Sequence, residues 1–420
     1  MVSVCLYFHV HQPHRLRNYH VLDIGEDNDY FDTEENKRIL QRVTEKCYLP
    51  MNNLLLDLIE NHPDRFNVSF SISGTAIEQM EAHAPKALQS FQDLAATGNV
   101  EFVNETYHHS LAYLNSKDEF DKQVQKHREA LNEYFNYEPT TFRNTELIFN
   151  NELAEYVEDK GYTALLGEGA DHLLGWRDPN HIYSTPITDD IDIFLRNYEL
   201  SDDIAFRFSN ESWEHHPLGA DTFAEWIDAI NGAGEIVNLF MDYETFGEHQ
   251  WASTGIFDFF EAMVNDVLNN PDNDFLTIEQ ASDRYPQRGE VDAHHYTSWA
   301  DARRDLGAWQ GNELQRQAHD ELYKLEEFVK ESDDNDLIEA WRRLTTSDHV
   351  YYMYTDGRSD GDVHDHFSPY DSPYKSYMFY MNALNDVARR LGATSQQRPL
   401  SETPSTLLND IPEEEERMHS

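Results

Sequence analysis

IVNLFMDYETFGEHQW, residues 236–251, is the stretch of this 420-residue sequence that decides the fold. Its apolar run, broken only by Asn238, ends at Asp242, and Glu244 follows two residues later. Such a run is typical of a buried strand in a parallel sheet, here with two carboxylates at its C-terminal end. Catalytic groups lie at these ends in parallel sheets and barrels, so Asp242 is a candidate catalytic residue. A loop aspartate beside a capping glutamate would give the same pattern.

Six similar strand-like segments precede this stretch and alternate with helical patterns or long loops. Each return between parallel strands needs a crossover of about a dozen residues or more. The alternation therefore predicts an α/β fold in which seven parallel strands are wound into a barrel. The expected strands are residues 2–11, 67–73, 100–106, 140–145, 162–166, 192–197 and 236–241.

The strand pattern fades after about residue 290, and a helical pattern replaces it. Leu337, Trp341 and Leu344 recur at helical spacing. Ser372 followed by Pro373 is a good start signal for a last helix. The final residues have little apolar surface to bury, which is typical of a disordered acidic tail. We therefore predict a catalytic barrel in residues 1–290, a helical bundle packed on it in residues 291–391, and a disordered acidic tail in residues 392–420.

The chain is strongly acidic, with 79 Asp and Glu against 32 Lys and Arg and a formal charge of -47. That charge repels nucleic acid and anionic membranes, so neither is an expected partner. The aromatic content of 13% and the regular core pattern distinguish the chain from a disordered acidic one. Molar salt would screen the self-repulsion, because the Debye length falls to about 3 Å at 1 M. We infer a halophilic cytoplasm.

Cys5 and Cys47 are the only cysteines, and each lies in a segment that looks buried. No disulfide framework or cysteine metal site is expected, which fits a reducing interior. The first residues lack the basic region of a secretory signal, and no apolar stretch approaches the roughly 20 residues of a membrane span. We expect a cytoplasmic protein, and the oligomeric state is not indicated.

The first expected strand ends in His9-Val10-His11-Gln12-Pro13. Histidines two residues apart on a strand point the same way, so this pair could bind one ligand or one metal, or simply lie in the core. A zinc site would need further ligands from other strand ends. A metal-dependent hydrolase or deacetylase using His9, His11, Asp242 and His249 is therefore an alternative.

Glu146 follows the expected strand of TTFRNTELIFNN, residues 140–151, and precedes a helix. The residue could cap that helix. It could also be a second carboxylate at the same mouth as Asp242. Glycoside hydrolysis needs two carboxyl groups with opposed protonation states across one site, and this requirement favours the second interpretation.

Five segments, taken in order, resemble the five sequence regions of glycoside hydrolase family 57. The resemblance covers about residues 1–390, and the form MDYETFGEHQW looks most like the archaeal alpha-amylase branch of that family. It implies an irregular seven-stranded (β/α) barrel, a retaining mechanism on alpha-glucans, and no metal cofactor for catalysis. The matching segments are His11-Gln12-Pro13, Gly98 to Phe102, Glu146, Asp242 to Gly247, and Ser347-Asp348-His349.

Carried onto this sequence, the resemblance makes Glu146 the nucleophile and Asp242 the general acid/base. Trp251 resembles a sugar-stacking tryptophan of relatives, displaced here by a slightly longer spacer. Weaker candidates for stacking on a sugar ring are Trp176, Trp213, Trp299 and Tyr352. Asn144-Thr145 differs from many relatives, and Tyr107-His108-His109 leaves the residue that serves the second region undecided. The substrate-binding residues that we predict are His9, His11, Gln12, Glu244, Trp251, Asp348 and His349.

Asp348 can also be argued from helical spacing alone. If its helix continues from Leu344, Asp348 lies on the buried stripe, where an unpaired carboxylate would be costly. A sugar, His9 or His11 could be its partner. Alternatively the helix breaks at Thr345-Thr346, and Ser347 or Asp348 caps the next segment.

These observations predict a retaining hydrolase of alpha-1,4-glucans that works by double displacement, an alpha-amylase by type. The two carboxyl groups should lie about 5 to 6 Å apart. Burial and the neighbouring Glu244 should both raise the pKa of Asp242. A 4-alpha-glucanotransferase or branching enzyme with the same residues stays open, as does a non-catalytic glucan-binding relative.

Overall fold

The computed structural model describes residues 1–188, 190–355 and 368–393. Each of the seven expected strands forms, and two further strands have two residues each. Most of the predicted acidic tail lies outside the described residues. The strands are β1 (Ser3–Val10), β2 (Val68–Ile72), β3 (Val100–Phe102), β4 (Thr141–Arg143), β5 (Ala164–Glu168), β6 (Ile182–Tyr183), β7 (Asp192–Arg196), β8 (Ile236–Asp242) and β9 (Asp274–Phe275).

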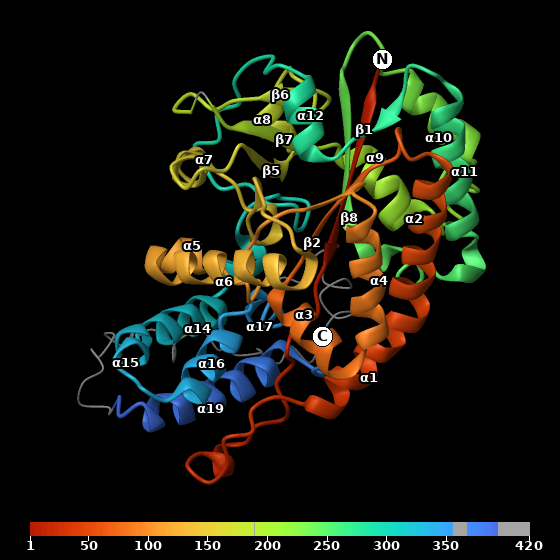
Figure 1. Ribbon diagram of the computed structural model, residues 1–420. Helices are drawn as coiled ribbons and strands as arrows, with labels where there is room; N and C mark the ends of the chain where they lie inside the picture. The colour runs from red at the N-terminus through yellow and green to blue at the C-terminus, as the bar shows by residue number, and fades with distance from the viewer. Residues whose placement is uncertain (189, 356–367, 394–420) are drawn as a thin grey trace, which may run out of the picture.

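The strands fall into two sheets, in the orders β3-β2-β1-β8 and β4-β5-β7-β6, with β9 added to β1. Every pair is parallel except β6 with β7. β1 and β8 run side by side through the centre of the molecule (Figure 1). Their register sets His9 opposite Asp242. The first and last expected strands of the barrel region therefore deliver their polar ends to one place.

The prediction of one continuous barrel needs correction, because the hydrogen-bonded ladder is interrupted between the two sheets. Between β3 and β4 only Asn104 bridges, donating its N–H to Thr141 and accepting from Arg143. The side-chain amide of Asn104 donates a hydrogen bond to the Tyr162 hydroxyl. The seven-stranded order and direction are those expected, but the two sheets are not closed into one ring.

On the other side, β7 and β8 are joined mainly through side chains. Arg196 donates to the carbonyl oxygen of Phe240 at 2.7 Å, and the Asn238 amide donates to that of Leu195 at 2.8 Å. One backbone hydrogen bond, from Asn197 to Asn238, accompanies them. These side chains satisfy strand carbonyl oxygens that a ladder would otherwise use, which explains the interruption.

Helices cover the outer face of the first sheet, where α2, α4, α10 and α11 lie together (Figure 1). Beneath these helices, the ring centroids of Phe8 and Phe70 lie 5.2 and 5.1 Å from that of Tyr243. The helices of this part are α1 (Thr33–Val43), α2 (Leu49–Asn61), α3 (Gly74–His83), α4 (Pro85–Ala96), α5 (Ala112–Asn115), α6 (Lys117–Phe135), α7 (Asn151–Glu158), α8 (Asp171–Leu174), α9 (Tyr198–Asp202), α10 (Ala220–Asp228), α11 (Ile256–Asn269) and α12 (Ile278–Arg284).

A second group of helices follows in the C-terminal part and packs around Trp341 and Leu384. It lies apart from the strands, on the far side of α6 (Figure 1). The last helix begins as expected, since Ser372 caps it by accepting the N–H of Lys375. Residues 285–306 contain no helix. The helices are α13 (Gly307–Gln310), α14 (Glu313–Tyr323), α15 (Glu326–Lys330), α16 (Asn335–Leu344), α17 (Ser347–Tyr351) and α19 (Pro373–Arg390).

Short 3-10 and π-helical turns connect several of these elements. One of these turns contains Glu146 and another contains Glu244. None of the helices in the described ranges has the length and apolar character needed to cross a membrane. The turns are η1 (Val21–Asp23), η2 (Thr44–Tyr48), η3 (Thr145–Leu147), η4 (Asp203–Arg207), η5 (Tyr243–Thr245) and η6 (Ala252–Thr254).

Candidate active site

Glu146 lies in η3, directly after β4, with a left-handed backbone conformation (φ 60°) that is unusual for a residue with a side chain. Both carboxylate oxygens accept hydrogen bonds, from His109 Nε2 at 3.0 Å and from Trp299 Nε1 at 2.7 Å. Burial alone would raise the pKa of Glu146. The hydrogen bond and charge of His109, together with the charge of Arg143, bring this pKa below its usual range. Glu146 is therefore ionised.

Asp242 ends β8 at the same mouth and has the opposite tendency. Burial, and then the negative charge of Glu146, raise the pKa of Asp242 to about 6, although Arg143 and His109 limit the rise. The like charge that raises it most is therefore Glu146 and not Glu244, the residue expected from the sequence. At a pH between the two pKa values, Glu146 is ionised while Asp242 holds a proton, and two carboxyl groups with pKa values shifted in opposite directions can serve as an acid/base pair.

Glu244 lies in η5, two residues past Asp242, and is buried. Its Oε1 accepts from the Tyr48 hydroxyl at 2.5 Å and from the Gln12 amide at 3.3 Å. Burial, followed by the charge of Asp242, raises the pKa of Glu244 to about 8, so its carboxyl group is mostly protonated at neutral pH. Gln12, a predicted sugar-binding residue, thus orients Glu244 here.

Three nearly parallel imidazole rings lie together at the mouth, and the ring of His109 contacts both of the others, the outer rings of His9 and His11. The ring centroids of His9 and His11 lie 4.7 and 4.1 Å from that of His109. His9 Nδ1 is hydrogen-bonded to Ser71 at 2.9 Å, and His11 Nδ1 to Ser73 at 2.7 Å. Burial lowers the pKa of both outer rings, and the charge of His109 lowers each further. The outer rings are therefore neutral beside a charged one.

Asp348 reaches this stack from α17 and pairs with His11, whose Nε2 donates to it at 3.0 Å. The expectation that Asp348 needs a partner such as His11 is confirmed. The helix does break, because α16 ends at Leu344 and α17 begins at Ser347, but the expected cap is wrong: Thr346 is the N-cap of α17, and no side chain caps it. His349 lies elsewhere: it is buried, its Nε2 bonds the Arg343 carbonyl oxygen at 3.2 Å, and burial lowers its pKa to about 4.

His109 and Glu105 are the residues that the sequence argument missed. His109 Nδ1 donates to Glu105 at 3.1 Å while its Nε2 donates to Glu146. Burial opposes protonation, but the hydrogen bonds to Glu105 and Glu146 raise the pKa of His109 to about 9. The sequence does not decide which residue of Tyr107-His108-His109 serves the second region, and no pattern in it singles out Glu105. Glu101, in the segment that matches the second region, accepts the N–H of Ile278 at 2.8 Å and so caps α12.

Trp251 was expected to be the main sugar-stacking tryptophan, but it is Trp299 that contacts a candidate catalytic residue. Trp299, a weaker stacking candidate by sequence, donates its indole N–H to Glu146, and its backbone N–H also donates to the Glu146 carbonyl oxygen at 3.2 Å. Trp251 precedes η6 and is 62% exposed. Its side chain is free to meet a ligand from solvent, and its sugar-stacking role stays a prediction.

Two groups of metal-ligand type occur among the described residues: His9 with Glu105 and His109, and His11 with His109 and Asp348. Neither contains Asp242 or His249, so the zinc set of the alternative interpretation is not assembled among the described residues. Both groups share His109, whose two ring nitrogens already donate to carboxylates. A metal would need the His109 ring to lose a proton that hydrogen-bonds a carboxylate, so the donors as arranged do not fit a metal ion.

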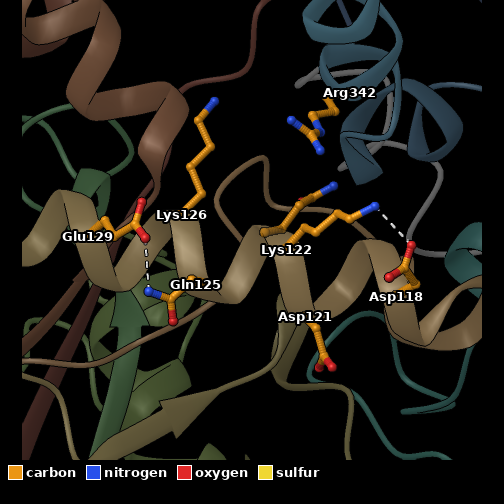
Figure 2. A pocket seen from close by; sticks show the side chains of 8 residues that line it. Asp118, Asp121, Lys122, Gln125, Lys126, Glu129 and Arg342 are labelled. Atoms are coloured by element: carbon orange, nitrogen blue, oxygen red, sulfur yellow. Dashed lines mark hydrogen bonds and ion pairs between the residues drawn. The ribbon is translucent and has the colours of Figure 1, made fainter. Parts of the chain in front are cut away.

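A separate hollow of about 420 Å³ lies between α6 and α16, lined by acidic and basic side chains (Figure 2). Lys122 pairs with Asp118 at 2.9 Å, and Arg342 pairs with Glu119 at 2.9 Å. Lys126 pairs with Glu339 from α16 at 3.1 Å. Because its cations are already neutralised, this hollow is an ion-paired contact between two helices and not a second candidate site.

The structure is an α/β fold in which two carboxyl groups with opposite pKa shifts, Glu146 and Asp242, lie where strands of the two sheets end at one mouth. Paired carboxyl groups of this kind are typical of glycosidases. The model of the family described as Glycosyl hydrolase family 57 matches residues 5–294. The chain belongs to this family. The match supports the resemblance noted in the sequence and makes the protein a glycoside hydrolase by family.

Similar proteins bear glucan-related names. A protein of Methanocaldococcus jannaschii named "Putative alpha-amylase" is 41% identical over 395 residues, which cover 90% of this chain and 82% of that protein. A branching enzyme from Pyrococcus horikoshii matches 93% of this chain and 94% of its own, with a TM-score of 0.65 and 14% identity. A 4-alpha-glucanotransferase from Thermococcus litoralis matches 93% of this chain with a TM-score of 0.66 and 14% identity, and the chain spans 60% of its length. At this identity the two solved structures show the fold alone.

Proposed function

We propose that this protein is a retaining hydrolase of alpha-1,4-glucans, an alpha-amylase by type. The observation that carries the proposal is the opposite shift of two carboxyl pKa values at one mouth: the pKa of Glu146 is lowered and that of Asp242 is raised. Family membership and the 41% identical relative support an alpha-glucan as the substrate. Glu146 is the nucleophile and Asp242 the general acid/base.

In the first step the Glu146 carboxylate attacks the anomeric carbon, and the bond to the glycosidic oxygen breaks while Asp242 gives that oxygen its proton. In the second step ionised Asp242 takes a proton from water, whose oxygen displaces Glu146 from the anomeric carbon. Asp242 ends protonated and Glu146 ionised, as at the start. Trp299 holds one oxygen of Glu146, leaving the charge localised for attack.

The sugar hydroxyl groups would meet the polar groups around the imidazole stack. His9, His11 and Asp348 lie along one side of the mouth, while protonated Glu244, oriented by Gln12, can donate a hydrogen bond. Trp251 would stack on a more distant sugar ring. His349, buried behind Asp348, would act only by supporting that residue.

Hydrolysis and glucan transfer share the glycosyl-enzyme intermediate, and they differ in whether water or a sugar hydroxyl reaches it. The solved relatives include a 4-alpha-glucanotransferase and a branching enzyme, which keeps this alternative in view. Incubation with maltoheptaose in molar salt, followed by chromatography, separates them. Shorter products alone support the hydrolase, and a ladder of longer products overturns it in favour of a transferase. An unchanged substrate with both carboxylates intact would contradict enzymatic activity on this glucan.

The formal charge of -47 supports a salt-rich cytoplasm as the working environment. We expect the unfolding temperature to fall steeply when KCl is diluted from molar concentration to about 0.1 M, because screening is lost. Circular dichroism melts at each concentration measure this. Sorbitol at matched osmolality is the control, because it does not screen charge. Equal stabilisation by sorbitol would contradict the electrostatic explanation.

A further inference from the structure

His109 and Glu146 lie in two turns that are tied together. Both have left-handed backbones, with φ of 52° and 60°. The Thr145 hydroxyl donates to the Ser110 carbonyl oxygen at 2.6 Å and lies 2.9 Å from the Thr106 hydroxyl. Such conformations persist where the surroundings over-determine them, so the two turns hold one imidazole–carboxylate geometry.

Helix α17 and the residue before it contact the turn that holds His109. Ser347, the first residue of α17, donates its backbone N–H to the His109 carbonyl oxygen at 3.0 Å, and Ser110 forms a β-bridge with Thr346. One residue further, Asp348 holds His11, which stacks on the His109 ring. Backbone and ring of His109 are thus both fixed from outside its own loop.

Glu105 anchors the far side of the imidazole. It is fully buried, and its Oε2 accepts from His109 Nδ1 at 3.1 Å and from Arg143 at 3.4 Å. Burial opposes ionisation, but the His109 hydrogen bond and the Arg143 charge bring the pKa of Glu105 well below its usual range. Because an ionised carboxylate can only accept, both ring nitrogens of His109 must carry protons to make both contacts.

From this geometry we propose that His109, oriented by Glu105, is a positioning residue for the glycosidase reaction, holding Glu146 ionised and fixing the direction of its attacking oxygen. The inference rests on the proposed function, because it takes Glu146 as the nucleophile. His109 acts through Glu146 and needs no contact with the sugar.

The positive charge of His109 acts on both members of the catalytic pair. It lowers the pKa of Glu146 and also limits the pKa of Asp242. Its removal should therefore move both limbs of the pH profile to higher pH, whereas damage to the fold would lower the rate without moving the limbs. The titratable and charged groups that face His109 are His9, His11, Glu105, Arg143, Glu146, Asp242 and Asp348.

The test compares His109→Gln with His109→Asn by the pH dependence of kcat/KM on maltoheptaose. Glutamine can keep a neutral N–H toward Glu146, and asparagine can keep one toward Glu105, but neither carries the charge. We expect both limbs to move up by about one pH unit in each variant. We expect kcat to fall about 10- to 100-fold with little change in KM, more in the asparagine variant. Unmoved limbs in both variants would overturn the proposal.

Two further variants control the comparison. Glu105→Gln should shift the limbs in the same direction by less, because His109 then loses its ionic anchor but keeps Glu146. His319→Gln replaces another buried histidine, in α14, away from the strand ends. Its limbs should stay in place, and a shift as large as that of His109→Gln would contradict a specific role for His109.

Two readouts keep this proposal separate from the proposed function. Nitrogen-15 NMR of the wild-type protein should show a doubly protonated His109 ring at neutral pH, and a singly protonated ring would overturn the positioning role without reference to activity. A fluorinated maltosyl fluoride should label Glu146 in the wild type, as mass spectrometry would show. Labelling elsewhere would contradict the proposed nucleophile. Labelling of Glu146 at the same rate and pH dependence in His109→Asn would overturn only the positioning role.

Discussion

Two strands bring the two carboxylates to one mouth at the ends of the sheets, and they do so in different ways. β8 is a buried strand of seven residues that ends in Asp242, whereas β4 has three residues and Glu146 follows it in a left-handed turn. Both oxygens of Glu146 accept hydrogen bonds. Among the described residues, no hydrogen-bond donor contacts the carboxylate of Asp242. Burial by itself would raise the pKa of both carboxyl groups. The hydrogen bonds to Glu146 lower its pKa, and they therefore decide that Asp242 is the group that holds a proton to higher pH.

The largest expected effect comes from removing the nucleophile. Glu146→Gly should lower kcat by about 10⁴-fold or more. Added azide should restore turnover with a beta-linked glycosyl azide, because azide fills the position of the lost carboxylate on the opposite face. The matched variant Asp242→Gly should give the alpha-linked azide instead, since azide then attacks the glycosyl-Glu146 intermediate. Nuclear magnetic resonance of the products reads the anomer, and exchanged outcomes would reverse the two roles.

Asp242→Asn should abolish proton transfer and yet stabilise the fold. The pKa of Asp242 is raised from 3.8 to about 6 in the folded protein, so its ionisation costs stability progressively between about pH 4 and 6 and fully above pH 6. Asparagine removes a cost on the order of 2–3 kcal/mol at pH 7.5 and almost none below pH 4. Thermal melts of both proteins at the two pH values measure this. A variant no more stable than wild type at pH 7.5 would contradict the explanation that ionised, buried Asp242 destabilises the folded protein.

Trp299→Phe tests how far the hydrogen bonds keep Glu146 ionised. Loss of the indole N–H should raise the pKa of Glu146, move the acidic limb of kcat/KM to higher pH, and lower kcat about 10-fold. Trp309→Phe is the matched control, because Trp309 is fully buried in a different cluster. The control should leave the acidic limb in place, and equal shifts in the two variants would show that the effect is not local.

The smallest effect is expected from Glu244→Gln. Because the pKa of Glu244 is raised to about 8, glutamine imitates the protonated side chain present at neutral pH and can still accept from Tyr48 and Gln12. Activity at pH 6 should change by less than about 3-fold. Glu244→Ala removes both contacts and should cost more. A large loss in the glutamine variant would mean that Glu244 works as a carboxylate.

Much of this site could be predicted, because strand ends leave a local signal. Three segments have the pattern of a strand and end in polar residues. These residues are Asp242, the pair His9 and His11, and Glu146. Parallel strands collect such ends at one edge, so their meeting followed from the pattern. Ser372 and Pro373 likewise marked a helix start through a local capping rule.

His109, Glu105 and Trp299 carried no comparable signal. His109 and Glu105 lie in an irregular loop after β3, where side-chain direction follows no period. Trp299 lies 153 residues from Glu146 and outside any helix or strand. The break between the two sheets was equally hidden, since it depends on where the side chains of Arg196 and Asn238 find acceptors.

The sequence by itself determined the strands, their order and the two carboxylates, because hydrophobic period and strand-end position are local properties of the chain. Only the tertiary structure decided which carboxylate is ionised. That choice depends on the hydrogen bonds from His109 and Trp299 to Glu146, and on the absence of such donors among the described residues at Asp242. A pKa is set by what lies within a few ångströms in space, and those neighbours come from distant parts of the chain.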